Sequence, residues 1–223
     1  MERQLIKTSD SSHTLYIPEM DEHYHSTHGA FQESKHVFIE KGFHYLERGI
    51  EPVNVLEIGF VTGLNALLTL IESEKQRRRV RYVGIEPYPL EKELYEKLNY
   101  GEVVGYENAG AFLTDMHEKQ WNFPYYISEY FVLNKLKTTF QDAALQPSMF
   151  HLIYYDAFAP GKQEEMWNKE LFQKCYNALA GGGVLVTYSS KGQVKRDLTE
   201  AGFKVEKLEG PQGKREMLRA IVA

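Results

Sequence analysis

The 223-residue sequence has a single cysteine, no long apolar run and no excess of positive charge. Cys175 alone excludes an internal disulfide and a cysteine-based metal site, and its apolar helical surroundings predict a buried structural thiol. The longest mostly apolar stretch, residues 54–71, contains Glu57 and is therefore a poor membrane span. The first residues, MERQLIKTSDSSH, lack the apolar core of a signal peptide, so we expect a cytoplasmic protein.

The net charge of −5 argues against a strongly basic nucleic-acid-binding protein, but the charge is unevenly distributed. Residues 161–223 carry 11 basic and 8 acidic side chains, whereas residues 1–160 carry 15 basic and 23 acidic ones. A polyanion would therefore meet the C-terminal third most favourably. The candidate phosphate contacts there are Lys191, Lys195, Arg196, Lys214 and Arg215. Arg77, Arg78, Arg79 and Arg81 are either a solvated helix end or a second set of phosphate contacts.

From Val53 onward, short apolar runs alternate with amphipathic stretches, which is typical of β-α units around a mainly parallel sheet. Seven strands are predicted, at residues 53–58, 81–85, 131–136, 151–155, 183–188, 204–208 and 217–222. Helices are predicted at residues 64–74, 90–98, 164–179 and 191–201. Residues 209–216 are too few for a crossover helix, so the last two strands must pair antiparallel.

Residues 1–50 precede this pattern, and we expect them to form an extension packed on a domain of residues 51–223. Within the extension, residues 4–17 predict a hairpin and residues 30–46 a helix. Residues 100–130 are longer than a usual α/β connection and rich in aromatic side chains. Either a cap over a site or a packed insertion would explain them.

The first predicted strand of the domain leads into a glycine loop at the start of a helix, Glu57-Ile-Gly59-Phe-Val-Thr-Gly63-Leu-Asn65. Such a loop lets the backbone approach a nucleotide-like ligand, although a purely structural turn has the same spacing. The second strand ends in Glu86, which could accept hydrogen bonds from both ribose hydroxyls or simply be solvated. NAD binding remains open, but its Gly-x-Gly-x-x-Gly motif is absent, and Glu57 suits a cationic amino-acid ligand better.

The fourth strand delivers Asp156-Ala-Phe158-Ala-Pro160-Gly-Lys162 at its carboxyl end. Open α/β sheets bind ligands in the crevice at this edge, so Asp156 is the strongest candidate for a catalytic group. Phe158 offers a face on which a base can stack. The structural alternative for Asp156 is a cap for the next helix.

Three segments resemble the methyltransferase part of the MnmC family of tRNA-modifying enzymes. They are Glu57-x-Gly59-Phe60-x-Thr62-Gly63-Leu64-Asn65, then Asp156-Ala-Phe158-Ala-Pro160-x-Lys162 with Glu165-Met166-Trp167, and finally Gly213-Lys214-Arg215-Glu216-Met217-Leu218. Nearer the N-terminus, Tyr24-x-Ser26 with Glu33-Ser34 and Val37-Phe38 is similar to the same family.

The resemblance implies a Rossmann-like class I fold that binds S-adenosyl-L-methionine (SAM). It also implies methyl transfer to the amine of 5-aminomethyl(-2-thio)uridine at the tRNA wobble position. This length cannot hold the FAD-dependent oxidoreductase half of the bifunctional enzyme, so the chain looks like a stand-alone type. A separate FAD-dependent or other enzyme would then supply the aminomethyl intermediate.

The expected site residues follow from the same motifs. Asp156 is the expected catalytic residue, and no metal is expected. The expected SAM-binding residues are Tyr24, Glu57, Gly59, Phe60, Thr62, Gly63, Asn65, Glu86 and Pro87. The expected substrate-binding residues are Phe158, Pro160, Lys162, Trp167, Lys214 and Arg215.

The chain departs from the family pattern at two places. Val61 occupies a position that is usually glycine, and a β-branched residue resists positive φ. Thr138-Thr139 stands where an acidic residue often contacts the adenine side of SAM. His23, His25, His28 and His36 suggest a metal site in principle, but closure over the ligand explains His25 and His28 more simply.

The amine chemistry limits what Asp156 can do. An alkylammonium titrates near ~10, so on the order of one molecule in 10³ is free amine at neutral pH. With an ordinary pKa near ~4, Asp156 would mainly orient the amine and stabilise the growing positive charge. Two other functions stay open: a SAM-dependent N-methyltransferase of a small amine or protein, and a catalytically silent RNA-binding subunit.

Overall fold

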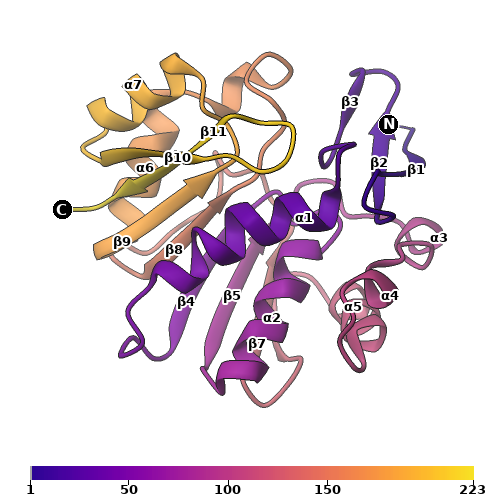
Figure 1. The fold of residues 1–223 in the computed structure, drawn as a ribbon. Coiled ribbons are helices and arrows are strands. Elements are labelled where there is room, and N and C mark those ends of the chain that lie inside the picture. Colours follow the sequence, from indigo (N-terminus) through magenta and orange to yellow (C-terminus); the bar gives the residue numbers. More distant parts are fainter. Residues whose placement is uncertain (1) are drawn as a thin grey trace.

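The computed structural model describes residues 2–223 and contains one large mixed sheet with a small N-terminal sheet beside it (Figure 1). The large sheet has the strand order β10-β11-β9-β8-β4-β5-β7-β6. Its strands are β4 (Val53–Ile58), β5 (Val80–Ile85), β6 (Pro124–Tyr126), β7 (Phe131–Leu136), β8 (Phe150–Tyr155), β9 (Leu179–Thr187), β10 (Lys204–Glu209) and β11 (Glu216–Ile221).

The centre of the sheet, β9-β8-β4-β5-β7, is parallel, and β10 and β11 form an antiparallel hairpin at one edge. This confirms the Rossmann-like fold expected from the sequence. The sheet has one strand more than the seven predicted, because the short β6 pairs antiparallel with β7 at the other edge. β6 was not predicted from the sequence because it has only three residues and begins with Pro124.

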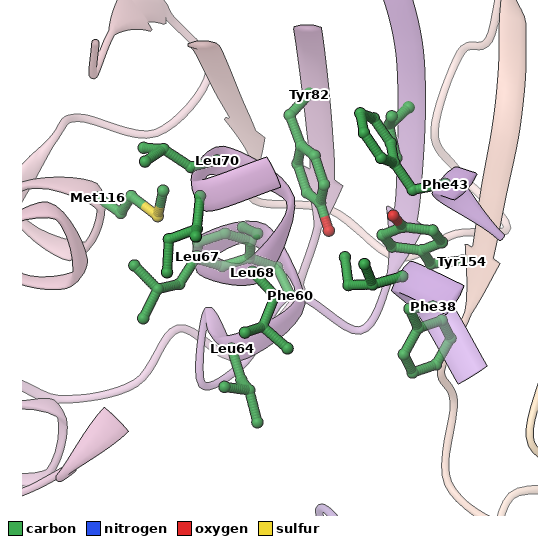
Figure 2. Packing of buried hydrophobic residues seen from close by; sticks show 14 of the residues in the cluster. Phe38, Phe43, Phe60, Leu64, Leu67, Leu68, Leu70, Tyr82, Met116 and Tyr154 are labelled. Carbon is green, nitrogen blue, oxygen red and sulfur yellow. The ribbon is translucent and has the colours of Figure 1, made fainter. Parts of the chain in front are cut away.

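Helices cover both faces of the sheet, as alternate residues of β4 demonstrate. Val53 and Val55 belong to a core cluster with α2 (Leu64–Gln76), whereas Leu56 and Ile58 belong to one with α6 (Lys169–Ala178) and α7 (Gly192–Glu200). Figure 2 shows part of the first cluster, where the ring of Tyr154 lies 5.1 Å from that of Phe38 and 6.1 Å from that of Tyr82. Cys175 lies fully buried in the second cluster, as the apolar pattern predicted.

Two predicted helices are shorter in the structure. Residues 90–98 contain only α3 (Lys92–Tyr95). Residues 164–179 divide into a 3-10 turn, η3 (Glu164–Met166), and α6, because Asn168 caps α6 by accepting a hydrogen bond from the Leu171 backbone N–H (3.0 Å). The remaining predicted helices and strands of the domain match within a few residues.

The N-terminal extension forms a three-stranded antiparallel sheet of β1 (Gln4–Lys7), β2 (His13–Ile17) and β3 (Glu22–His23). The predicted hairpin is therefore present, with one further strand. Residues 30–46 contain α1 (Ala30–Ser34), a π-helix η1 (Lys35–Glu40) and a 3-10 turn η2 (Phe43–Tyr45) instead of one continuous helix. The break falls at Gly42, where a Cβ would lie 2.5 Å from the Phe38 carbonyl oxygen.

The aromatic segment of residues 100–130 contains α4 (Tyr100–Val103), α5 (Ala109–Glu118) and β6. Leu113 and Met116 of α5 are buried against α2 in the first core cluster. The segment is therefore a packed insertion rather than a cap. Within residues 2–223, none of the helices is both long and apolar enough to cross a bilayer.

Candidate active site

A cavity of about 520 Å³ opens at the carboxyl ends of β4, β5 and β8. The strands and the loops that follow them contribute Glu57, Ile58, Gly59, Val61, Thr62, Ile85, Glu86, Pro87, Tyr88, Asp156, Ala157, Phe158 and Lys162. The loop after β7 adds Thr139, Phe140 and Gln141, and the turn around η3 adds Gln163, Glu165 and Met166. Met20, Tyr24 and His25 of the N-terminal extension form a further wall.

The glycine loop after β4 lines the cavity at the point where it approaches the loop that follows β8. Gly59 has φ +98°, and a Cβ there would lie 2.6 Å from the Asp156 carbonyl oxygen. Gly63 has φ +73° and is the N-cap of α2. Val61 is not among the residues with positive φ, so the β-branched side chain is compatible with this loop.

Asn65 lies in the first turn of α2 and bridges two carboxyl groups. Its Nδ2 donates to Glu57 Oε1 (2.8 Å) and to Asp156 Oδ2 (2.9 Å). The two strands that carry these acids are direct neighbours in the sheet. Asn65 therefore does not line the cavity. Instead of the cofactor contact expected from the sequence, its amide contacts both acids.

Three carboxyl groups with raised pKa values face one cavity. Burial raises the pKa of Glu57 to about 8, that of Asp156 to about 7 and that of Glu86 to about 7. The amide of Asn65 partly opposes this shift at Glu57 and Asp156. Asp156 is thus a better proton acceptor than its ordinary pKa near ~4 suggested. The cavity is suited to a ligand that carries positive charge.

Glu86 directly follows β5, and the loop that carries it is hydrogen-bonded to the N-terminal extension. Its Oε1 accepts a hydrogen bond from the Tyr88 backbone N–H (2.8 Å). Arg3 donates to the Tyr88 carbonyl oxygen (2.8 Å) and to Tyr24 Oη (3.0 Å). The N-terminal strand region is in this way joined to the loop that presents Glu86.

The N-terminal wall, formed by Met20, Tyr24 and His25, contacts residues on the opposite side of the cavity mouth. The rings of Tyr24 and Phe158 lie 4.8 Å apart. Lys162 Nζ donates to the Met20 carbonyl oxygen (2.9 Å). His25 Nε2 lies 2.9 Å from Thr62 Oγ1, and burial lowers the pKa of His25 to about 4, which keeps its ring neutral.

Several residues singled out from the sequence do not line the cavity. Phe60 is buried in the first core cluster, and Gly63 faces α5, because a Cβ there would lie 3.3 Å from side-chain atoms of Leu113 and His117. Trp167 is buried, and its indole N–H donates to the Phe158 carbonyl oxygen (2.7 Å). Phe60, Gly63 and Trp167 therefore lie outside the lining of the cavity. Pro160 lies in the loop that ends at Lys162, outside the lining of the cavity.

The two basic residues of the β10–β11 tip differ from each other. Arg215 is exposed. Lys214 turns inward and forms an ion pair with the buried Glu33 of α1, with Nζ 2.5 Å from Oε1. Lys191 lies close to the Asp156–Lys162 loop, because a Cβ on Gly161 would lie 3.5 Å from its Nζ. Lys191 and Arg215 thus keep their charge available to a polyanion, whereas the charge of Lys214 is already compensated.

Other cavity residues were not expected from the sequence. They come from loops in which no sequence pattern indicated a site, and they are Met20, Tyr88, Phe140, Gln141 and Gln163. Thr139 does line the cavity, and Thr138 does not. Arg78 is a structural residue, since its guanidinium donates to the carbonyl oxygens of Glu47 and Ile50.

The histidines have separate partners. His25 bonds to Thr62, and His36 Nε2 lies 2.9 Å from the Glu209 carbonyl oxygen. In the part of the chain that the structure describes, no three His, Cys, Asp or Glu side chains form a group able to hold a metal ion.

Residues 117–223 match the family model of an S-adenosyl-L-methionine-dependent methyltransferase. The chain is 31% identical to the tRNA 5-methylaminomethyl-2-thiouridine biosynthesis bifunctional protein MnmC of Cupriavidus metallidurans, over 94% of this chain and 33% of that protein. It is also 31% identical to the MnmC of Leptospira interrogans, over 90% of this chain and 32% of that protein. The chain thus spans about a third of the length of these relatives.

Two solved structures share the fold. MnmC2 from Aquifex aeolicus superposes with a TM-score of 0.79 at 22% identity, covering 100% of this chain and 70% of that one. Spermidine synthase from Thermotoga maritima gives 0.59 at 14% identity, covering 99% and 69%. The sequence match, the fold and the acidic cavity agree, and the chain belongs to the S-adenosyl-L-methionine-dependent methyltransferases as a relative of the MnmC proteins.

Proposed function

We propose that this chain transfers the methyl group of SAM to the primary amine of 5-aminomethyl(-2-thio)uridine at the wobble position of tRNA. The observation that carries the proposal is Asp156, which faces the cavity at the end of β8 beside Glu57 and close to Phe158. The names of the curated relatives, which refer to 5-methylaminomethyl-2-thiouridine biosynthesis in tRNA, supply the substrate.

The residues present fit SAM in charge and shape. Glu57 and Glu86 face the cavity from neighbouring strands, and the glycine loop keeps the space between them free of side-chain atoms at Gly59. Glu86 would accept hydrogen bonds from the ribose hydroxyls, and Glu57 would balance the positive charge of the amino-acid part. Thr62, Pro87 and Tyr24 would complete the contacts. When bound, SAM supplies a methyl group that its sulfonium already activates.

Asp156 would act on the substrate amine. Its Oδ2 is fixed by Asn65. A carboxylate at this place can accept a proton from the alkylammonium and orient the nitrogen lone pair toward the methyl group. With SAM bound, the amine nitrogen would take the methyl group while the C–S electron pair stays on sulfur, and the Asp156 carboxylate would accept the proton that leaves the nitrogen. The raised pKa of Asp156 favours this proton transfer.

The wobble base would enter between the N-terminal wall and the Asp156 loop. Phe158 offers a ring for stacking a pyrimidine. Lys162 at the cavity mouth, with Lys191 and Arg215 further out, would contact the phosphates. Residues 51–223 would form the domain that binds SAM and transfers the methyl group, and residues 1–50 would close the cavity and add Tyr24 to the SAM contacts. A cytoplasmic location follows from a tRNA substrate, and a separate FAD-dependent or other enzyme would supply the amine.

The test uses radiolabelled SAM with tRNA that bears or lacks the aminomethyl group. We expect label to enter only the tRNA that bears the amine. Equal labelling of both tRNAs would contradict the proposal. Labelling of a small amine or of protein alone would favour a different N-methyltransferase, and SAM-independent tRNA binding without any transfer would favour a silent RNA-binding subunit.

A further inference from the structure

Lys214 makes two interactions with the same ammonium group. Its Nζ lies 2.5 Å from Glu33 Oε1 and 3.9 Å from the centroid of the Tyr188 ring. Glu33 is 8% exposed and belongs to α1, which the β10–β11 loop approaches in Figure 1. An ammonium shared between a buried carboxylate and an aromatic face is fixed in position, unlike a solvated lysine at a hairpin tip.

Glu33 connects Lys214 to the N-terminal wall of the cavity. The second carboxylate oxygen of Glu33 accepts a hydrogen bond from the Ser26 backbone N–H (2.9 Å). Ser26 follows directly on Tyr24 and His25, which line the cavity. The carboxylate therefore holds the backbone of this wall with one oxygen and the ammonium with the other.

Tyr188 connects Lys214 to the Asp156 loop. Its Oη donates to the Ala157 carbonyl oxygen (2.8 Å). Ala157 lies between Asp156 and Phe158, and all three line the cavity. Burial, together with the carboxylates of Asp156 and Glu33, holds the pKa of Tyr188 well above its ordinary value, so its hydroxyl stays protonated and can donate.

We propose that Lys214 is a positioning residue of the methyl-transfer site, whose ammonium joins the N-terminal wall, through Glu33, to the Asp156 loop, through Tyr188. The proposal rests on the proposed function and assigns Lys214 a role different from the phosphate contact that its sequence position suggested. Without the ammonium, the N-terminal wall and the Asp156 loop would no longer be connected through Lys214. Asp156 and Phe158 would then be held less precisely relative to Tyr24.

The charge of Lys214 also acts on Asp156. The charged groups that act on Asp156 are Glu57, which shares the Asn65 amide, together with Glu33 and Lys214, and the last two also act on the pKa of the neutral His25. Glu33 raises the pKa of Asp156, and Lys214 lowers it. Removing the ammonium alone leaves Glu33 uncompensated, so the pKa of Asp156 should rise further. A residue with a merely structural role would not move this pKa.

The chain offers a matched control on the same hairpin. Lys207 of β10 pairs with Glu216 of β11 at 2.7 Å, but both side chains are more exposed, and neither lines the cavity. Lys207→Met therefore removes an ion pair of the same type without touching the site. Lys214→Met removes the proposed link, Lys214→Arg keeps its charge, and Tyr188→Phe removes only the hydrogen bond to Ala157.

The experiment measures kcat, KM for tRNA, the pH profile and backbone hydrogen exchange for these variants. We expect Lys214→Met to lower kcat about 10-fold, the scale of a lost alignment, with KM and the salt dependence of tRNA binding nearly unchanged. The acid limb of its profile should move to higher pH. Lys214→Arg should restore most of kcat. The effects of Lys214→Met and Tyr188→Phe should be non-additive in the double variant.

Hydrogen exchange tests the link without activity. In Lys214→Met, exchange should accelerate at Ser26 and in residues 157–163, and Lys207→Met should leave both segments unchanged. If the wild type fails to methylate tRNA, the proposed function is wrong, and the exchange comparison still decides the role of Lys214. Unchanged exchange in Lys214→Met, equal effects of the two lysine variants, or a lowered salt slope with normal kcat would overturn the positioning role.

Discussion

The Asn65 side-chain amide lies 2.9 Å from Asp156 Oδ2 and donates to it, while the same nitrogen donates to Glu57. Asn65 is the second residue of α2, whose N-cap is Gly63 in the left-handed conformation, and its amide reaches both acids from there. The amide thus holds two carboxyl groups from neighbouring strands at a fixed separation. This relationship places Asn65 among the positioning residues of the site.

Asn65→Ala should lower methyl transfer by roughly 10- to 10²-fold, because Asp156 would lose the donor that fixes its orientation. The affinity for SAM should fall less, because in the SAM site only Glu57 loses a hydrogen bond. Single-turnover rates and calorimetry would separate the two effects. Asn54→Ala is the matched control, since Asn54 also donates from its amide, to the Met149 carbonyl oxygen (2.9 Å), at the other end of β4. Similar rates in the two variants would remove Asn65 from the mechanism.

Asp156→Asn should keep SAM affinity within a few-fold but lower methylation of tRNA by roughly 10²-fold or more. An amide can neither take the proton nor balance positive charge on the nitrogen. Near-normal single-turnover rates in this variant would assign Asp156 a structural role. Asp197→Asn on α7, whose carboxylate accepts only a surface hydrogen bond from Gln193, serves as the control.

The pH dependence of methylation should have an acid limb set by Asp156. Burial raises its pKa to about 7, so the carboxylate becomes protonated, and activity falls, as the pH drops through that value. Above it, activity should continue to rise as the substrate amine loses its proton. A profile of kcat/KM between pH 5.5 and 9 would show both trends. An acid limb that survives in Asp156→Asn would assign it to another group.

Glu86→Ala should weaken SAM binding strongly, and Glu86→Gln should do so less. The carboxylate is buried at the end of β5, where it can accept both ribose hydroxyls. Calorimetry with SAM measures the effect, and NAD is the comparison ligand. Unchanged SAM affinity in Glu86→Ala, or a wild-type preference for NAD, would overturn this assignment.

SAM binding should release protons near pH 7. Glu57, Asp156 and Glu86 have pKa values raised to about 7–8 and are partly protonated there in the free protein. A bound cation favours their ionised forms and lowers these pKa values, so affinity should rise with pH up to about 8. Binding heats in buffers of different ionisation enthalpy count the protons. The Glu57→Gln variant should release fewer protons when it binds SAM. Release of the same number as in the wild type would exclude Glu57 as a source of these protons.

Phosphate contacts should come from Lys191 and Arg215. Replacing both with alanine should weaken tRNA binding and flatten the dependence of log affinity on log salt, by at most roughly one unit per lost contact. SAM binding should not change. A wild-type salt slope in the double variant would redirect attention to the exposed Arg77 and Arg79.

The strand ends were predictable from the sequence, and the contacts between distant segments were not. Asp156 and Glu86 could be found because parallel strands bring their carboxyl ends to one edge. The role of Asn65 depends on the register of β4 against β8, which no local pattern encodes. The sequence predicted Lys214 as a phosphate contact, and its ion pair was missed because its partner, Glu33, lies 181 positions earlier in the chain. Long-range packing therefore decided these two side chains.

Locating the transferred methyl group tests the central claim most directly. After reaction with radiolabelled SAM, tRNA bearing the aminomethyl group is digested to nucleosides, with Asp156→Asn and amine-free tRNA run in parallel. We predict that the label co-elutes with 5-methylaminomethyl(-2-thio)uridine, and that it is nearly lost with Asp156→Asn and absent from amine-free tRNA. Label on any other nucleoside, or equal label with Asp156→Asn, would contradict the account.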